Sequence, residues 1–423
     1  MNTDQLRDPQ DRRTFIEHCA RMAFGITVLP ALGGNALAAA AQRGAGFGKA
    51  KHVIMITLQG GLSHIDSFDP KTGPGKGPGD AINTKADFQL TSFLPETAKI
   101  ADKITVIRSM SAKVGVHATA QYLMRTGFEK RGTVVHPMLG AWAHHYLGPS
   151  SKTLPATVCI NRNSAHGNGF FPASHAPLPI RDPDDGLANV KPPVAGEKQA
   201  QRLELLEKLD AGFRTRVKDE SVRAYNDFYD STLQLMRSTD LKAFDITSEP
   251  AGISERYGRS KLGRGCLLAR RLVEHGVRFI EIESGGWDMH KEIEDAMEDK
   301  GGDFDRVFAA LVADLDSRGL LDSTLVVVAT EFGRKPDFDG NGRGHHPLVF
   351  SCVLAGGGVK RGFVYGASDA RGYAPKANAV TPGDLHATIG WAAGLPIEKE
   401  ILSPAGRPFT VGNKGKPALG VFA

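Results

Sequence analysis

The chain has few cysteines, and no two of them are spaced as in a metal-binding or redox motif. There are four in 423 residues: Cys19, Cys159, Cys266 and Cys352. Cys19 lies in the N-terminal segment discussed below, which leaves an odd number and no CxxC pair. Because a chain of this length can bury a sizeable core, we expect no disulfide framework, and Cys159 and Cys352 should be small buried hydrophobes.

Three further features are missing. The formal net charge is only +5 and no basic block stands out, so nucleic acid is not expected as a partner. No stretch has the apolar length of a transmembrane helix, so no stable membrane span is expected. No GxGxxG motif joins a strand to a helix. The glycine-rich segment "GGGVKRG" follows a strand candidate, but no helical pattern follows it, so a dinucleotide site is unsupported.

The N-terminus has the pattern of an export signal. Arg12 and Arg13 in "DRRTFI" precede the uncharged stretch "MAFGITVLPALGGNALAAAA", and Ala36-Leu37-Ala38 offers a small-residue cleavage site. These features predict a twin-arginine signal over residues 1–40, recognition by the twin-arginine export machinery, and a periplasmic or secreted protein. The alternative is a chance arginine pair before an amphipathic first helix.

Residues 41–423 are expected to form a single α/β domain. Short apolar runs alternate with amphipathic helical patterns, which is typical of a mainly parallel sheet flanked by helices on both faces. The strand candidates are 52–58, 103–110, 153–160, 277–283, 323–330 and 348–357. In "TPGDLHATIGWAAG", Thr381 followed by Pro382 predicts the N-cap and first turn of a helix. Residues 161–196 have the composition of a loop, and residues 197–275 are charged and helical, which predicts a helical insertion.

Side chains able to bind a cation follow several of these strands. Ligands of open parallel sheets bind beyond the carboxyl ends of the strands, so these residues are candidates for one site. They are His64 and Asp66 after the first strand, His117 after the second, Asp288 and His290 after the fourth, and Glu331, Arg334, His345 and His346 after the fifth.

Each of these residues also has a simpler interpretation. Asp288 could cap a helix, the two adjacent histidines could pack against Pro347, and a lone histidine is usually a satisfied core or surface residue. Taken together, however, the carboxylates and imidazoles form a mixed nitrogen and oxygen set of the kind that binds Zn²⁺ or Mn²⁺. Such a cation lowers the pKa of water and polarises an ester oxygen.

Long motifs resemble one family. The segments "GGLSHIDSFDPK", "QYLMRTG", "HPMLGAW", "ARRLVEHGVRFIEIESGGWDMH", "STLVVVATEFGRKP", "GRGHHP" and "AGGGVKRGFVYGASD" look like the secreted twin-arginine family catalogued as domain of unknown function 1501. That family is similar in fold to the sulfatases and alkaline phosphatases. The resemblance implies an alkaline-phosphatase-like domain and does not by itself imply an activity.

The resemblance can be carried over residue by residue. Glu331 and Phe332 stand where sulfatases have an Asp-His pair of metal ligands, so the resemblance implies one metal site and an interrupted second one. With Thr126-Gly127 matched, His117 occupies the place of the nucleophile and Gln121 that of an arginine. Asp288 and His290 resemble the ligand pair of the first phosphatase metal.

We therefore expect an exported metal-dependent hydrolase of a sulfate or phosphate ester. One divalent metal (Zn, Mn or Ca) would be held by Asp288, His290 and His346, with Glu331 as fourth ligand or base; His345 and Asp66 are further candidate ligands. His64 and His117 would face the substrate, and Arg334 would hold the free oxygens of the anion.

Two other functions stay open. The first is a catalytically inactive, metal-containing binding protein of the same fold, with a saccharide or cell-surface polymer as ligand. The second is an isomerase or transferase of the same superfamily. Convergence of the candidate residues in an accessible cleft would favour the enzyme, whereas a cleft filled by Trp287 and Phe332 would favour the binding protein.

Overall fold

The computed structural model describes residues 44–162, 167–187, 197–198, 201–202, 204–206, 208, 211, 232–236 and 238–423. The predicted signal over residues 1–40 and much of the predicted helical insertion lie outside the described residues. The description below concerns the compact unit Ala45–Ala423.

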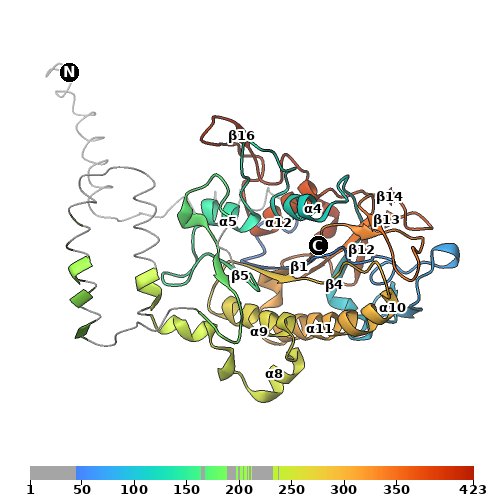
Figure 1. The fold of residues 1–423 in the computed structure, drawn as a ribbon, viewed down its shortest axis with the longest axis horizontal. Coiled ribbons are helices and arrows are strands. Elements are labelled where there is room, and N and C mark those ends of the chain that lie inside the picture. The colour runs from blue at the N-terminus through green and yellow to red at the C-terminus, as the bar shows by residue number, and fades with distance from the viewer. Residues whose placement is uncertain are drawn as a thin grey trace, which may run out of the picture. The chain divides into compact units, whose positions relative to one another are not determined.

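One eight-stranded sheet organises this unit (Figure 1). Its strand order is β12-β4-β11-β8-β1-β7-β5-β6. β11 runs antiparallel to both of its neighbours, and all other neighbouring pairs are parallel. The strands are β1 (His52–Leu58), β4 (Ile104–Met110), β5 (Thr157–Ile160), β6 (Leu178–Ile180), β7 (Phe279–Ser284), β8 (Thr324–Thr330), β11 (Phe350–Ala355) and β12 (Phe363–Tyr365). The predicted mainly parallel sheet is confirmed.

All six strand candidates lie in this sheet, and the two strands that sequence patterns missed are its edges. β6 and β12 have three residues each, too few to show a periodicity. β6 falls in the segment predicted to be loop, so that prediction is wrong for Leu178–Ile180. Pro179 has no backbone N–H to donate to a neighbouring strand. It is tolerated in β6 because an edge strand has only one neighbour in the sheet.

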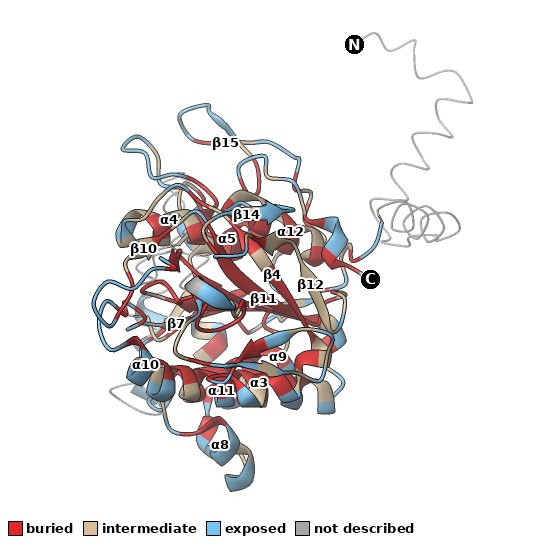
Figure 2. Cartoon of the chain, turned by 90° about the vertical axis from the view of Figure 1, so that its right-hand side faces the viewer, coloured by how far each residue is buried: buried red, intermediate tan, exposed pale blue. Residues whose placement is uncertain are grey.

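Helices cover both faces of the sheet (Figures 1 and 2). Along β1, Val53 and Met55 pack in one apolar cluster with α5 (Leu139–Leu147) and α12 (Pro382–Ala393). The alternate residues Ile54 and Ile56 pack in a second cluster with α9 (Lys261–Glu274) and α11 (Gly302–Ser317). A strand whose two faces are both buried reads as a continuous apolar run, which is the pattern seen in the sequence.

The remaining α-helices and strands of the described residues have seven residues or fewer, apart from α4, which has ten. α4 (His117–Thr126) follows β4 and contacts α12. The others are α3 (Pro95–Lys99), α8 (Ala251–Tyr257), α10 (Ile293–Ala296), and the two-stranded pairs β2 (Ala81–Asn83) with β3 (Gln89–Thr91), β9 (Gly333–Arg334) with β10 (His345–His346), β13 (Ala367–Ser368) with β14 (Pro375–Ala377), and β15 (Ile401–Leu402) with β16 (Pro408–Phe409).

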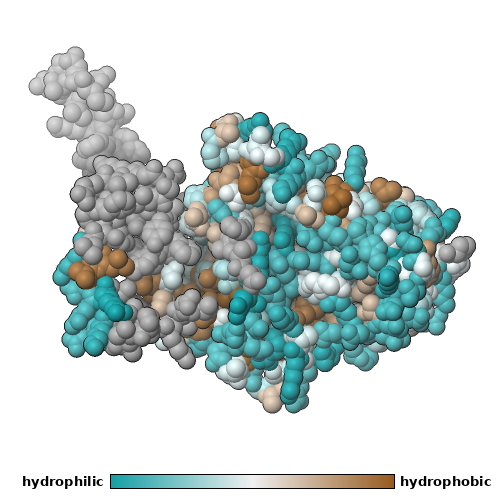
Figure 3. Space-filling view, viewed as in Figure 1, coloured by the Kyte–Doolittle hydropathy of each residue, from teal (hydrophilic) through white to brown (hydrophobic). Residues whose placement is uncertain are grey.

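Two local predictions can be compared directly with the structure. Thr381 caps α12 in a capping box with Asp384, as its sequence position predicts. Cys159 and Cys352 are buried, as predicted, and Cys266, for which no prediction was made, is also free and buried. Among the described residues, no helix is both long and apolar enough to cross a membrane. The face seen in Figure 3 is mostly hydrophilic, with apolar residues in small separate patches.

The topology gathers three chain segments at the carboxyl ends of three neighbouring central strands. β1 lies between β7 and β8 and runs parallel to both. The loops that leave these three strands therefore emerge side by side at their carboxyl ends. They carry Gly60, Asp288 and Glu331, which form the framework of the candidate site.

Candidate metal centre

A tight turn after β1 lets two loops approach each other closely. Gly60 has φ 126°, and a Cβ at this position would overlap the backbone of Trp287 and Asp288. The Trp287 amide donates to the Gln59 carbonyl at 3.0 Å, and the Gly60 amide donates to Glu331 Oε1 at 2.7 Å. The close approach therefore requires glycine at position 60, and it brings Asp288 beside the end of β8.

Asp288 does not cap a helix. α10 begins at Ile293, with Glu292 in the N-cap position. Between β7 and α10 the backbone makes two successive tight turns, in which Met289 N donates to Trp287 O and His290 N to Asp288 O, both at 3.0 Å. These turns bring the side chains of Asp288 and His290 to the same side, with His290 Nε2 3.0 Å from Asp288 Oδ1.

The β9–β10 ladder decides which of the two adjacent histidines belongs to the site. His345 pairs with Arg334, and His346 pairs with Gly333. Residues directly opposite each other in an antiparallel pair point to the same face, so Arg334 and His345 both face Asp288. His346 points to the other face, where its Nε2 lies 2.7 Å from the Tyr373 carbonyl. The prediction that His346 is a metal ligand is therefore wrong, and His345 faces Asp288 instead.

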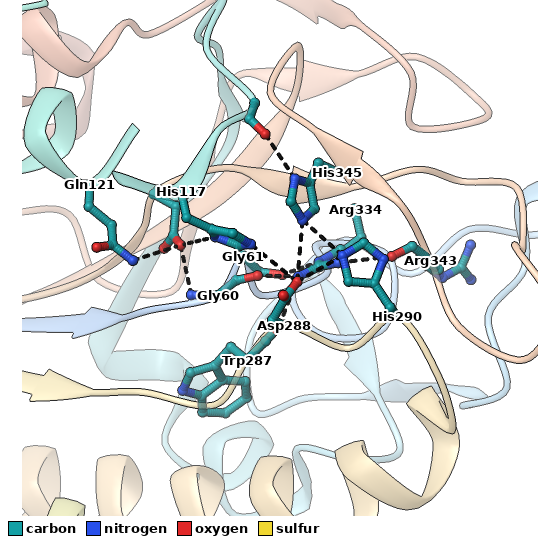
Figure 4. Close-up of polar contacts among 12 residues, drawn as sticks. Gly60, Gly61, His117, Gln121, Trp287, Asp288, His290, Arg334, Arg343 and His345 are labelled. Atoms are coloured by element: carbon teal, nitrogen blue, oxygen red, sulfur yellow. Dashed lines mark hydrogen bonds and ion pairs between the residues drawn. The ribbon is translucent and has the colours of Figure 1, made fainter. Parts of the chain in front are cut away.

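Three imidazole nitrogens converge on the carboxylate of Asp288 (Figure 4). The Nε2 atoms of His117 and His345 each lie 3.3 Å from Asp288 Oδ1. The Nε2 atoms of His290 and His345 are 2.9 Å apart. His117, Asp288 and His345 offer three ligand atoms within 4.8 Å of one another. The structure thus brings together four of the residues singled out in the sequence.

Hydrogen bonds behind the site fix the orientation of two imidazoles. His117 Nδ1 lies 2.9 Å from Glu331 Oε1, and His345 Nδ1 lies 2.8 Å from the Gly115 carbonyl. Because these oxygens act as acceptors, Nδ1 carries the proton and Nε2 presents its lone pair to the centre. His117 Nε2 is buried and has no hydrogen-bond partner. Ligating histidines typically have this arrangement, with the second ring nitrogen held by a carboxylate or a backbone carbonyl.

The chemical types of the donors fit a divalent transition metal. Three imidazole nitrogens and one carboxylate are ligands that Zn²⁺ and Mn²⁺ accept. A tetrahedral cation with metal–ligand bonds of about 2.05 Å would hold its donors about 3.3 Å apart. The three imidazole contacts to Asp288 and the contact between His290 and His345 are 2.9–3.3 Å long. Among the described residues, the group whose ligand atoms all lie within 4.8 Å of one another is His117, Asp288 and His345, with His290 beside it. Ca²⁺ prefers six to eight oxygen ligands, so this set does not suit it.

Arg334 keeps Asp288 ionised. Burial alone would raise the pKa of Asp288, but the hydrogen bond and charge of Arg334, with a smaller contribution from His345, outweigh it and lower the pKa to about 2. Arg334 itself is fully buried and donates to Gly61 O at 2.9 Å, to Arg343 O at 2.9 Å, and to Gly60 O. The expectation that Arg334 holds substrate oxygens is wrong, because its donors bind backbone carbonyls and Asp288.

Glu331 lies behind the donors and does not reach the centre as a ligand. Its Oε1 accepts hydrogen bonds from Gly60 N, His117 Nδ1 and Gln121 Nε2, at 2.7, 2.9 and 3.3 Å. Its expected role as fourth ligand or base is therefore replaced by the orientation of His117. Gln121 follows His117 by one helical turn on α4, so the i, i+4 spacing is the sequence signal that relates them.

A family model matches residues 50–422, with the description "Protein of unknown function (DUF1501)". The chain belongs to the DUF1501 family. The family expected from the sequence motifs is thus confirmed, and it brings no activity with it. A comparison with curated proteins gives no match.

Solved structures that resemble this DUF1501 protein include a sulfatase, a phosphatase and a phosphonate hydrolase. The PsFucS1 sulfatase from Pseudoalteromonas sp. is 15% identical, with 88% of this chain and 73% of that chain covered and a TM-score of 0.38. The alkaline phosphatase from the Antarctic bacterium TAB5 is 14% identical, with 73% and 92% covered and a TM-score of 0.34. The phosphonate monoester hydrolase SpPMH from Silicibacter pomeroyi is 11% identical, with 88% and 77% covered and a TM-score of 0.36. Likeness at this level says nothing about the reaction.

Two candidate residues of the DUF1501 protein lie outside the centre. Asp66 is buried against Arg343, whose Nε lies 2.7 Å from Asp66 Oδ2. His64 is buried, with Nε2 2.9 Å from the Gly372 carbonyl, and burial lowers its pKa to about 4. Neither the expected ligand role of Asp66 nor the expected substrate contact of His64 is supported, because the turn at Gly60 and Gly61 directs the chain after β1 back into the core.

Aromatic residues pack behind the centre and leave its solvent side open. Phe332 is fully buried, with ring centroids 4.9 Å from His117 and 4.6 Å from His345. Trp287 is also fully buried and packs edge-on against Phe304 of α11 at 5.9 Å. The side chains of Asp288 and His290 are each 46% exposed. Solvent therefore reaches Asp288 and His290 although the two aromatic rings are buried.

Proposed function

We propose that this DUF1501 protein is an exported, metal-dependent hydrolase of a sulfate or phosphate ester. One divalent cation would be held by His117, Asp288, His290 and His345. The observation that supports this proposal is the convergence of three imidazole Nε2 atoms on an ionised carboxylate, two of them with their Nδ1 protons held by fixed acceptors.

Each residue around the proposed cation has a separate role. Asp288 supplies negative charge at neutral pH because Arg334 stabilises its ionised form. Glu331 keeps the His117 proton on Nδ1. Partial burial lowers the pKa of His290, which favours the neutral ring that a ligand must have. A bound divalent cation supplies a Lewis acid that polarises an ester oxygen and acidifies water.

In the part of the chain that the structure describes, no hydroxyl or thiol nucleophile contacts the centre. Among the described residues, no hydroxyl or thiol hydrogen-bonds to any of the four donor atoms. We therefore propose direct attack of water on sulfur or phosphorus. The ester bond breaks, the alcohol leaves with a proton, and the inorganic anion carries the oxygen of the water.

A metal-containing binding protein is the second candidate, and the number of donors favours it. Structural zinc sites are closed by four protein ligands, whereas catalytic sites usually have three and an open position. His290 lies beside the three donors His117, Asp288 and His345, and with it the protein would supply four ligands and fill a tetrahedral shell. The exposure of Asp288 and His290 favours the enzyme instead, since a cation could there expand its coordination toward solvent.

Hydrolysis of small esters by the metal-loaded protein tests the proposal. The protein, purified without chelator and supplied with Zn²⁺ or Mn²⁺, is assayed with an aryl sulfate and an aryl phosphate. We expect turnover of one of them, and loss of both metal and turnover in His117→Ala and Asp288→Asn. A folded protein with its metal bound and no turnover of either ester would favour the binding protein.

The proposal that the protein is exported rests on the twin arginines of the sequence alone, because residues 1–43 lie outside the described part of the chain. Arg12→Lys combined with Arg13→Lys should leave unprocessed precursor in the cytoplasm, measured by fractionation and immunoblotting. Normal accumulation of this double variant in the periplasm would contradict the proposal.

A further inference from the structure

A second concavity lies apart from the metal centre. Its volume is about 740 Å³, and none of the four donors lines it. Six segments form its wall: the chain after β4, the carboxyl end of α4, the loop 128–136 that follows α4, the start of α12, the β16 strand with the preceding Arg407, and the turn that follows β16. Figure 1 shows α4, α12 and β16 on the same side of the sheet. We call this concavity the α4–α12 pocket.

Its rim is basic. Lys113, Arg131, Arg407 and Lys414 line the pocket, and all four are exposed. Lys414 lies 3.2 Å from Glu400. For the other three, the described residues provide no carboxylate at ion-pair distance, although Arg407 donates to the Thr133 hydroxyl at 3.2 Å. A concave wall with several unneutralised cations concentrates positive potential and attracts anions.

The pocket also has acidic lining residues, and they differ in what they can still bind. Asp384 is used at the start of α12, where it accepts from Thr381 N at 2.9 Å and Lys416 N at 2.7 Å. Glu129 is exposed. A carboxylate accepts hydrogen bonds from sugar hydroxyls, which a saccharide carries along its length and the backbone of DNA does not. This mixture favours a charged saccharide over a nucleic acid.

Aromatic rings form the floor. Phe128 and His136 are stacked, with centroids 4.3 Å apart, and Phe409 packs edge-on against them at 5.5 and 5.1 Å. All three residues line the pocket, and Phe409 is partly exposed. The negative face of an aromatic ring attracts polarised C–H groups, such as those on the flat side of a sugar ring.

The position of the pocket relative to the metal centre indicates a polymer. His117 is the first residue of α4, and Gly127, which lines the pocket, is its C-cap. An α-helix of ten residues is about 15 Å long at 1.5 Å per residue. A small ester at the centre could not reach the pocket over this length, whereas a chain of sugar residues lying along α4 could occupy both places.

We propose that the α4–α12 pocket is a distal subsite for a polyanionic saccharide, sulfated or phosphorylated, whose susceptible ester lies at the metal centre. The inference rests on the proposed function for the second clause only. Binding of the polymer in the pocket needs neither the cation nor turnover, and the two can therefore fail separately.

Binding of charged dextrans to matched charge variants tests the subsite. The pocket variant is Lys113→Gln with Arg131→Gln. The control variant is Lys85→Gln with Lys99→Gln, which removes the same charge from exposed lysines near α3, a helix that packs against α11 on the other face of the sheet. Dextran sulfate, dextran phosphate, neutral dextran and a single-stranded DNA oligonucleotide are titrated calorimetrically at low and moderate salt.

We expect wild type and the control variant to bind one or both charged dextrans equally, with the preferred dextran showing whether the chain takes sulfate or phosphate. The pocket variant should bind it about tenfold more weakly. Neutral dextran and DNA should bind more weakly than the charged dextrans. Turnover of the small aryl ester should be unchanged in the pocket variant, because the metal centre is intact.

Three results would overturn the subsite: no binding of either charged dextran by wild type, equal weakening in the pocket and control variants, or DNA binding as tight as that of the charged dextrans. If charged dextrans bind through the pocket while no ester is hydrolysed, the subsite stands and the hydrolase proposal fails.

Discussion

At the scale of single residues, the centre depends on groups that do not touch the cation. Arg334 and Glu331 each hold one donor in the form that a cation needs: Asp288 as a carboxylate, and His117 with its proton on Nδ1. Both partners are buried, so their contacts are little weakened by water. Sequence patterns identified both residues as part of the site and assigned them the wrong roles, because burial and partner are properties of the folded chain.

Glu331→Gln should weaken metal binding while the fold is retained. The glutamine carbonyl can still accept from Gly60 N, but the negative charge that holds the His117 proton is lost. We expect metal affinity to fall about 10- to 100-fold, as for other residues that orient a ligating histidine. Competition with a chromophoric chelator measures it.

The control is Glu283→Gln. Glu283 lies at the same end of the sheet and pairs with Arg125 and Arg162, but with none of the four donors. Its affinity for metal should stay close to that of wild type. Equal behaviour of the two variants would show that Glu331 does not act through His117.

At the scale of elements, the sequence predicted the positions of the main strands along the chain well, but it did not predict the register in which strands pair. β1 has the predicted bounds, and α12 starts at its predicted cap. Both are determined by local signals, namely a continuous apolar run and a Thr-Pro start. Which of the two adjacent histidines faces Asp288 depends on the register of a two-residue ladder between β9 and β10, which no periodicity records.

The turn after β1 offers a test of how the elements position the centre. In Gly60→Ala, the added Cβ would overlap the Asp288 backbone, whereas in Gly276→Ala it would meet no atom within 4 Å. Both glycines have positive φ, so both variants should lose about 1–3 kcal/mol of unfolding free energy through backbone strain. Only Gly60→Ala should also lose metal.

Urea unfolding and elemental analysis of the two variants measure these effects. Retention of the full metal content in Gly60→Ala would show that the close approach of the two loops does not determine the position of Asp288.

At the scale of the whole molecule, the mainly parallel sheet followed from alternating apolar runs and helical patterns, whereas the antiparallel direction of β11 did not. A buried strand has the same composition in either direction, and only the connection decides. The short edge strands β6 and β12 carry too few residues for any pattern to reveal them.

The stability of the whole unit should fall on mild acidification for a reason unrelated to the metal. Burial lowers the pKa of His64 and of His386 to about 4, below the value of about 6.5 that histidine has in an unfolded chain. Between these pH values the unfolded state binds protons that the folded state does not. Stability is therefore present above pH about 6.5 and is lost as the pH falls toward 4, by about 3 kcal/mol for each histidine.

Urea unfolding between pH 7.5 and 4.5 checks this prediction, with excess chelator present so that loss of a cation does not contribute. His386→Gln keeps a donor for the Met124 carbonyl and should show a smaller loss over this range. The same pH dependence in this variant and in wild type would contradict the assignment.

The central claim is that His117, Asp288, His290 and His345 bind one divalent cation. Elemental analysis of the protein purified without chelator, in wild type and in the paired variants His345→Asn and His346→Asn, tests it most directly. The two variants remove neighbouring histidines of the same ladder that face opposite ways. The account predicts one equivalent of Zn or Mn in wild type and in His346→Asn, and little in His345→Asn, with all three proteins folded. No metal in wild type under replete conditions, or equal metal in both variants, would contradict it.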